Sequence, residues 1–398
     1  MKKLIYMIEN FFIERDFDRF DLQYYFDNNA DIEIWDITQF SNSNFSRLIK
    51  PKDEIKKNYV KKFKSINDIE NALRSIDNTK TLFAAEITLD IRTISIFKLF
   101  SKYKIKYFVN SGALITSDPR YNKKNILKRF KLLFKKEIGT IINYLQNLLL
   151  RIFGPRFFGV SDVPIYFKEA EIAEQREDLN RKIIGKNTKI ILSHPKDYDT
   201  YLKCKKQNSD QYKCDAVLID QMIGFHNDNI RVGEKQNSEE WYKSLKIFFN
   251  YLKKNYSIDT TICAHPRSNG EINNFISDYP IIKNKTPDLI KNCSFVICQN
   301  TSAVTFAALF NKPMIFIYNH IEMKNKSSKI DHGGRGDFFA SFFKKKPISI
   351  ENLKNFDLKK ELKIDQKSYQ DFIKKYIKSW GTDKPKSEVI LELLTSQS

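Results

Sequence analysis

Short apolar runs alternate with amphipathic or charged segments along most of the chain. In the first half, the runs that predict buried strands are Lys3–Ile8 and residues 32–37, 81–87, 105–109 and 162–167. In the second half they are residues 189–193, 216–220, Thr260–Ala264, residues 295–298 and Met314–Tyr318. Helical patterns, such as residues 91–103 and 239–255, lie between them. This alternation predicts an α/β protein with doubly wound parallel sheets.

The rhythm of strands and helices predicts two domains. We place an N-terminal α/β domain at residues 1–185 and a C-terminal α/β domain at residues 186–350, because a glycine-containing segment around Gly185 separates the two series. Residues 351–398 are predicted to be C-terminal helices, and a path back to the N-terminal domain is open to them. Residues 53–64 are polar and are expected as helix or loop, and the glycine-rich residues 324–346 are expected as a loop.

Residues 123–158 interrupt the alternation with a basic amphipathic helical insertion. Seven lysines and arginines occur in residues 123–136, interleaved with leucine, isoleucine and phenylalanine, and a more apolar stretch follows. A basic amphipathic helix suits an anionic membrane surface. The alternative is a helix whose apolar face packs inside the protein.

Composition narrows the class of partner. The 398 residues carry 68 Lys and Arg against 48 Asp and Glu, a net charge of +20, which favours anionic partners. No apolar run is long enough to span a membrane, and the first apolar residues are expected as a strand rather than a signal sequence. The five cysteines show no metal-type spacing and are expected to be reduced. No zinc-finger, basic-zipper or RNA-recognition signature occurs, so nucleic acid is not the expected partner.

Polar clusters follow the predicted strands of the second domain. Because ligands of parallel sheets bind at the carboxyl ends of the strands, these clusters predict a site. Its candidate members are Asp220, His226, His194, His265, Pro266, Arg267, Asn300, Thr301 and Ser302. The last three open a short apolar helix, whose N-terminus attracts phosphate.

Three passages within residues 215–319 carry a family resemblance: VLIDQMIGFHND, AHPRSNG and QNTSAVTFAALFNKP. They resemble the GT-B glycosyltransferases that use CMP-activated sugars, namely bacterial sialyltransferases, polysialyltransferases and Kdo transferases, and more loosely proteins called surface carbohydrate biosynthesis proteins. The resemblance implies two Rossmann-like domains facing a cleft, with the N-terminal domain on the acceptor side. It also implies that His265 binds the CMP phosphate or assists its departure, while Thr301 and Ser302 hold that phosphate. The expected reaction moves a 2-keto-3-deoxy acid sugar, a sialic-acid-like nonulosonate or Kdo, to a surface glycan of lipopolysaccharide, capsule or O-antigen.

The catalytic carboxylate has two candidates. Asp220 is the first, as a general base or as a nucleophile, and Glu86 at a strand end of the first domain is the second. The acidic-Gly pattern from which inverting sialyltransferases take their base is absent, so inversion and retention both stay open. The Asp197-x-Asp199 pair mimics a metal-binding motif of another transferase fold, and neither a metal nor a cofactor is expected besides the CMP-sugar donor.

Two alternatives remain from the sequence. One is an alditol phosphotransferase using CDP-glycerol or CDP-ribitol, whose phosphate demands are similar. The other is a basic nucleic-acid- or membrane-binding protein without catalysis. For the transferase, the expected location is cytoplasmic, at the inner face of the cytoplasmic membrane, where residues 123–158 would contact anionic lipid and the acceptor would be a glycan or lipid-linked glycan.

Overall fold

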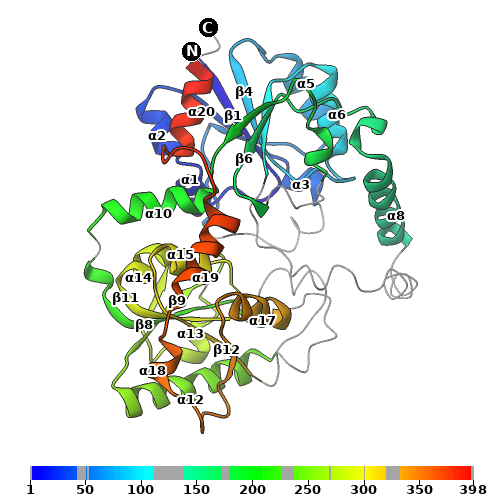
Figure 1. The fold of residues 1–398 in the computed structure, drawn as a ribbon. Helices are drawn as coiled ribbons and strands as arrows, with labels where there is room; N and C mark the ends of the chain where they lie inside the picture. Colours follow the sequence, from blue (N-terminus) through cyan, green and yellow to red (C-terminus); the bar gives the residue numbers. More distant parts are fainter. Residues whose placement is uncertain are drawn as a thin grey trace. The chain divides into compact units, whose positions relative to one another are not determined.

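The computed structural model describes residues 2–42, 51, 53–111, 138–172, 179–208, 210–225, 237–268, 270–299, 301–319 and 332–395. The chain forms two compact units, each built on one parallel sheet (Figure 1). Unit 1 holds the described residues up to Lys196 and from Lys378 onward, and unit 2 holds those from Asp197 to Ile377. None of the helices in the described part of the chain is long and apolar enough to cross a membrane.

The sheet of unit 1 has seven strands, and every pairing in it is parallel. In spatial order they are β3 (Val60–Lys62), β2 (Asp31–Asp36), β1 (Lys3–Ile8), β4 (Thr81–Glu86), β5 (Tyr107–Asn110), β6 (Ile165–Lys168) and β7 (Lys189–Leu192). The direction of winding reverses between β1 and β4. Such a switch point opens a crevice at the carboxyl ends of the two strands.

Both faces of this sheet are covered, which explains why its central strands are almost continuously apolar. On β1, Ile5 and Met7 belong to one buried cluster, whereas Leu4 and Tyr6 belong to another. These alternating residues face opposite sides. The helices of unit 1 are α1 (Glu14–Arg19), α2 (Leu22–Asp27), α3 (Thr38–Ser41), α5 (Ile66–Arg74), α6 (Ile94–Lys102), α8 (Ile138–Phe153), the 3₁₀ helices η1 (Pro155–Phe158) and η2 (Arg181–Ile183), and α20 (Lys386–Thr395).

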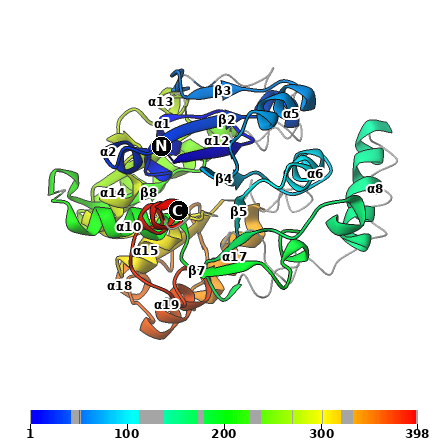
Figure 2. The ribbon, with the colours of Figure 1, turned by 90° about the horizontal axis from the view of Figure 1, so that it is seen from above.

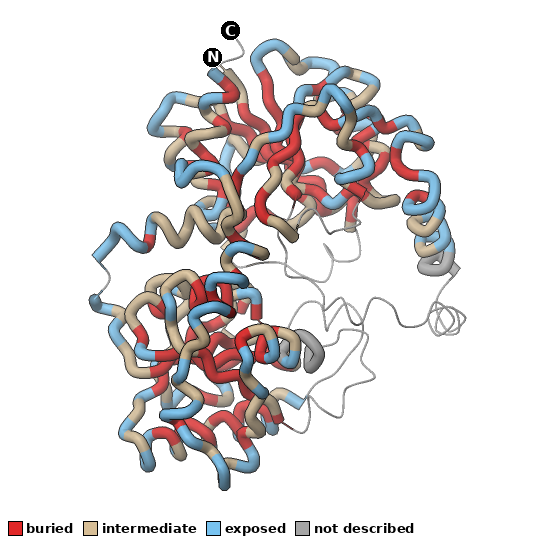
Figure 3. Tube along the Cα trace, viewed as in Figure 1, coloured by how far each residue is buried: buried red, intermediate tan, exposed pale blue. Residues whose placement is uncertain are grey.

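The C-terminal helix α20 is part of unit 1. Its Ile390, Leu393 and Leu394 are buried in the same cluster as Leu22 and Tyr25 of α2. The N- and C-terminal segments therefore lie side by side in Figures 1 and 2. Figure 3 shows the buried strands at the centre of this unit and exposed residues around it.

The sheet of unit 2 has six parallel strands. Their order is β10 (Ile281–Lys283), β9 (Thr260–Ala264), β8 (Cys214–Ile219), β11 (Cys293–Cys298), β12 (Met314–Tyr318) and β13 (Ile348–Ser349). The helices are α10 (Lys196–Lys206), the 3₁₀ helix η3 (Asp210–Tyr212), α12 (Ser238–Tyr256), α13 (Asn273–Ile276), α14 (Thr286–Asn292), α15 (Val304–Leu309), α17 (His332–Phe342), α18 (Leu358–Glu361), α19 (Gln366–Phe372) and the π-helix η4 (Ile373–Ile377). The first residue of α10, Lys196, belongs to unit 1. The winding reverses between β8 and β11, so this sheet also has a switch point.

The predicted doubly wound α/β class is confirmed, and three of the predicted strands, β1, β9 and β12, have the predicted bounds. Three expectations differ from the structure. Val60–Lys62 forms edge strand β3, although its polar residues predicted helix or loop; an edge strand needs little apolar surface. Lys189–Leu192 was placed in the second domain but pairs with β6 of the first sheet. His332–Phe342, within the expected loop, is helical.

Candidate functional site

Polar residues follow four neighbouring strands of the second sheet. His265 follows β9, Asp220 follows β8, Gln299 follows β11 and Asn319 follows β12. Because the strands are parallel and adjacent, their carboxyl ends meet at one edge, and strands two apart are separated by about 10 Å. The switch point between β8 and β11 lies at the middle of this row.

The turn after β9 orients the ring of His265. Its Nδ1 accepts a hydrogen bond from the backbone N–H of Arg267 at 3.1 Å, and its carbonyl accepts one from the N–H of Ser268 at 2.9 Å. The Ser268 hydroxyl in turn donates to the carboxylate of Glu271 at 3.0 Å. Since Nδ1 accepts, the neutral ring carries its proton on Nε2 and presents a donor there. Pro266 and Arg267 are half-buried in the same turn.

The turn after β11 carries two successive hydroxyl residues, Thr301 and Ser302. Thr301 is buried, and its Oγ1 accepts the backbone N–H of Ala303 at 3.1 Å. Ser302 is exposed. This hydroxyl turn leads into α15, whose Val304, Ala307 and Ala308 are buried and hold the turn on the sheet.

Asp220, directly after β8, is held by hydrogen bonds to both of its carboxylate oxygens. Only 1% of Asp220 is exposed. Its Oδ1 accepts the hydroxyl of Tyr242 at 3.0 Å, and its Oδ2 accepts the backbone N–H of Met222 at 3.1 Å. Burial raises the pKa of Asp220 to about 6, against the hydrogen bonds from Met222 and Tyr242, which lower it. These contacts suit a residue that holds the end of β8 in place.

The raised pKa of Asp220 predicts a pH-dependent stability. The folded protein binds this proton up to a pH of about 6, whereas an unfolded chain loses it near 3.8, so ionised Asp220 weakens folding as the pH rises through this window. Relative to the wild type, we expect the free energy of unfolding of Asp220→Asn to rise by about 2 kcal/mol between pH 4 and pH 7. Urea unfolding of both proteins across this range measures the difference. Parallel stability curves would contradict the prediction.

The structure separates the sequence-predicted residues into two groups. His265, Pro266, Arg267, Thr301, Ser302 and Asp220 lie on neighbouring strand ends of unit 2. Glu86 and His194 belong to unit 1. His194 is buried, with its Nδ1 3.4 Å from the Nζ of Lys378, and so is not part of the strand-end row in unit 2. His226 and Asn300 lie outside the described residues.

Glu86 follows the same rule of strand ends, in the first sheet. Its Oε1 accepts the amide of Asn110 at 2.8 Å and the ammonium of Lys196 at 2.6 Å. Burial would raise the pKa of Glu86, but Lys196 outweighs it and the pKa stays below its usual range. Burial lowers the pKa of Lys196 to about 8, with Glu86 acting against that shift. A carboxylate held this way is a weak proton acceptor at neutral pH.

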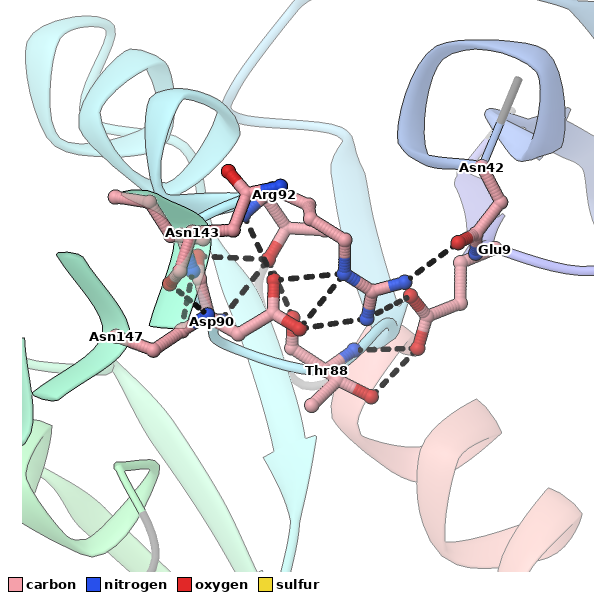
Figure 4. A network of polar contacts seen from close by, with 9 residues as sticks. Glu9, Asn42, Thr88, Asp90, Arg92, Asn143 and Asn147 are labelled. Carbon is pink, nitrogen blue, oxygen red and sulfur yellow. Dashed lines mark hydrogen bonds and ion pairs between the residues drawn. The ribbon is translucent and has the colours of Figure 1, made fainter. Parts of the chain in front are cut away.

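A second polar network surrounds the switch point of the first sheet (Figure 4). Arg92 donates from Nε and Nη2 to the carboxylate of Asp90, and its Nη1 donates to Asn42 at 2.8 Å. Glu9, directly after β1, accepts from Arg92 at 3.3 Å and from the hydroxyl of Thr88 at 2.5 Å. The network thus joins the ends of β1 and β4 to the segment before α6.

Several residues of these networks were missed by sequence reasoning. Tyr242, Ser268 and Glu271 hold the predicted site in place from α12 and from the turn after β9. Gln299 and Asn319 are buried polar residues directly after strands. Their position after an apolar run could have identified them in the sequence as members of the strand-end row. Among the described residues, no group of three or more His, Cys, Asp or Glu side chains is arranged to hold a metal ion.

The sequence matches no protein-family model and no curated protein. Its fold is similar to that of a putative UDP-N-acetylglucosamine 2-epimerase from Listeria monocytogenes, with a TM-score of 0.51, 10% identity and coverage of 99% of this chain and 96% of that one. A UDP-GlcNAc 2-epimerase from Methanocaldococcus jannaschii, in complex with UDP-GlcNAc and UDP, is 15% identical over 99% of both chains, with a TM-score of 0.48. The spinosyn forosaminyltransferase SpnP is 11% identical over 99% of both chains, with a TM-score of 0.46.

At this level of identity the likeness concerns the fold alone. That fold is GT-B, with two parallel Rossmann-like sheets, and it confirms the fold expected from the sequence.

Proposed function

We propose that the protein is a nucleotide-sugar-dependent glycosyltransferase whose donor is a CMP-activated 2-keto-3-deoxy acid sugar. The observation that carries the proposal is the His265–Arg267 turn, with its ring orientation set by a backbone N–H, on the same strand-end row as the Thr301–Ser302 turn. The GT-B fold supports a nucleotide-sugar donor at the carboxyl edge of the second sheet. The three passages that resemble CMP-sugar transferases support the cytidine donor.

The transfer breaks the bond between the anomeric carbon of the sugar and the CMP phosphate oxygen, and the bonding electrons leave with the phosphate. A hydroxyl of the acceptor forms the new bond to that carbon, and its proton passes to the solvent. Negative charge therefore grows on the phosphate as the bond breaks. A hydrogen-bond donor from His265 Nε2 and the guanidinium of Arg267 would stabilise that charge most where it is largest, in the transition state.

The other candidate residues take supporting roles in this proposal. Thr301 and Ser302 would hold the phosphate through hydroxyl and backbone donors. Asp220 would act as a positioning residue, because both of its oxygens already accept hydrogen bonds inside the protein. Glu86 fits acceptor binding better than proton abstraction, given its ion pair with Lys196.

We infer that the acceptor is a surface glycan or a lipid-linked glycan, handled at the inner face of the cytoplasmic membrane. The net charge of +20 supports an anionic surface as a partner. The sequence assigned that contact to residues 123–158; residues 123–137 lie outside the described residues, whereas α8 and η1 are described.

Nucleotide binding tests the donor class directly. We expect CMP to raise the melting temperature, because a ligand present at a hundredfold excess over its Kd stabilises the folded state by about 2.7 kcal/mol. UDP and GDP should give no comparable shift. Cytidine serves as the matched control that lacks the phosphate, and UMP as the control that changes only the base.

A larger shift with UDP than with CMP would overturn the CMP donor. A shift with CDP-glycerol or CDP-ribitol that exceeds the shift with CMP-sugars would favour the alditol phosphotransferase instead. If cytidine raises the melting temperature as much as CMP does, His265 and Arg267 do not bind the phosphate.

A further inference from the structure

Helix α8 of unit 1 carries an exposed apolar stripe. Its Ile142, Leu145, Leu149, Ile152 and Phe153 are all exposed, and so is Phe157 in η1 directly after the helix. Their spacing places the five α8 residues on one side of the helix. Figure 3 shows α8 at the edge of unit 1, with most of its surface exposed or half-buried.

The stripe is the outer side of a helix that is anchored on its other side. Leu150 is fully buried in the core of unit 1. Asn147 accepts the backbone N–H of Ile91 at 3.0 Å, next to the network around Arg92 (Figure 4). Asn147 also donates to the carbonyl of Asn143, one turn earlier. These contacts fix which side of α8 faces unit 1 and which side faces away.

The end of the helix is equally well defined. Gly154, with φ of +80°, ends α8 and donates its N–H to the carbonyl of Leu150 at 2.9 Å. The ammonium of Lys182 hydrogen-bonds the carbonyl of Arg151. The rings of Phe153 and Phe157 stack with centroids 5.0 Å apart, which extends the apolar stripe past the helix end.

Basic side chains lie near the end of α8. Arg151, Arg156, Arg181 and Lys182 are exposed around the end of α8, and Arg156 is paired with Asp162. The sequence around the helix has the same bias, since residues 119–161 contain ten Lys and Arg and one acidic residue, Glu137. An apolar stripe with basic residues near its end matches a surface that is negatively charged outside and apolar beneath.

We propose that the exposed stripe of α8 and η1 docks on the surface of an anionic lipid bilayer. Its apolar side chains would enter the boundary between headgroups and acyl chains, while Arg151 and its basic neighbours contact the headgroups. A second copy of the chain fits less well, because the basic residues near the end of α8 in the two copies would approach each other and repel. This docking rests on the proposed location at the cytoplasmic membrane, and the stripe is the surface that would hold the protein there.

The test is sedimentation of the full-length protein with vesicles made of equal parts phosphatidylglycerol and phosphatidylcholine, at low salt. We expect the wild type to bind these vesicles and to bind vesicles of phosphatidylcholine alone at least about tenfold more weakly. Replacing Ile152→Gln and Phe153→Gln together should weaken binding by at least about tenfold, since two inserted apolar side chains are lost. Arg151→Glu should weaken it and reduce its dependence on salt.

Helix α12 of unit 2 supplies matched controls. Ile247 is 57% exposed on that helix, close to the 62% of Ile152, so Ile247→Gln makes a comparable chemical change elsewhere. Lys254 is exposed on the same helix, and Lys254→Glu reproduces the charge change of Arg151→Glu. Both controls should bind vesicles like the wild type. The rise in melting temperature caused by CMP should be the same in every variant as in the wild type. The stripe belongs to unit 1, whereas the proposed donor site belongs to unit 2.

Two results would overturn the proposal. One is vesicle binding by Ile152→Gln with Phe153→Gln that equals binding by Ile247→Gln. The other is a wild-type protein that stays in the supernatant with the anionic vesicles at low salt. A dimer in analytical ultracentrifugation that the same double substitution dissociates would then assign the stripe to a second copy of the chain. Loss of the CMP shift with vesicle binding intact would instead count against the donor proposal alone.

Discussion

Replacing His265 with alanine is expected to lower turnover by a factor of about a hundred to a thousand, the usual cost of removing one preorganised donor to a developing charge. The physical reason is that the ring orientation is set by the N–H of Arg267, so the Nε2 donor is in place before the phosphate begins to leave. The measurement is release of CMP from a CMP-activated acid sugar under saturating donor. The half-buried position of His265 leads us to expect little change in melting temperature.

His265→Asn is the control that separates the donor from the turn. The asparagine Oδ1 can accept the backbone N–H two residues later, as Nδ1 of His265 does, but the side chain does not reach the position of Nε2. We expect this variant to lose turnover as severely as the alanine variant. If asparagine restores turnover, His265 acts through the shape of the turn and does not contact the phosphate. Near wild-type turnover in both variants would remove His265 from the site.

The second large effect concerns the ion pair that holds α20 to the first sheet. Lys386 and Glu169 are both buried and paired, and Lys386 Nζ also donates to Asn110 Oδ1 at 3.2 Å. Lys386→Met leaves the carboxylate of Glu169 buried without its counter-charge. We expect the free energy of unfolding to fall by about 3–5 kcal/mol, as for other broken buried pairs. Urea unfolding followed by circular dichroism measures the change.

Lys384, two residues earlier, is the matched control. It pairs with Glu388 and Glu392 at the surface, so Lys384→Met should change stability little. Adding Glu169→Gln to Lys386→Met should recover part of the loss, because the residue left behind is then neutral. If Lys386→Met is no more destabilising than Lys384→Met, the buried pair does not hold α20 in place.

The Lys386–Glu169 pair also bears on how α20 joins the first sheet. Asn110 also hydrogen-bonds Glu86, so this pair is connected to a third strand end. Lys386 of α20 thereby helps to link the carboxyl ends of β4, β5 and β6. A truncated protein that ends before α20 would lose this link together with the apolar contacts of Ile390 and Leu393. The C-terminal residues are therefore structural parts of unit 1.

The α/β class, most strand positions and the polar residues that end the strands of the second sheet could be predicted from the order of residues alone. These features are local: an apolar run such as Thr260–Ala264 reports burial on both faces, and His265 is at the strand end because it directly follows that run. The hydroxyl turn at Thr301 and Ser302 was visible for the same reason.

Two features could not be predicted in this way: which strands are neighbours, and which polar side chains already have hydrogen-bond or ion-pair partners inside the protein. Strand β7 joins the first sheet through its pairing with β6, and β8 lies between β9 and β11; strand pairing of this kind connects residues far apart in sequence and leaves no periodic signal. Asp220 turned out to be buried against Tyr242 of α12, and Glu86 to be paired with Lys196. Whether a carboxylate is available for chemistry depends on such distant partners, since burial and ion pairs set its pKa and its access to a substrate.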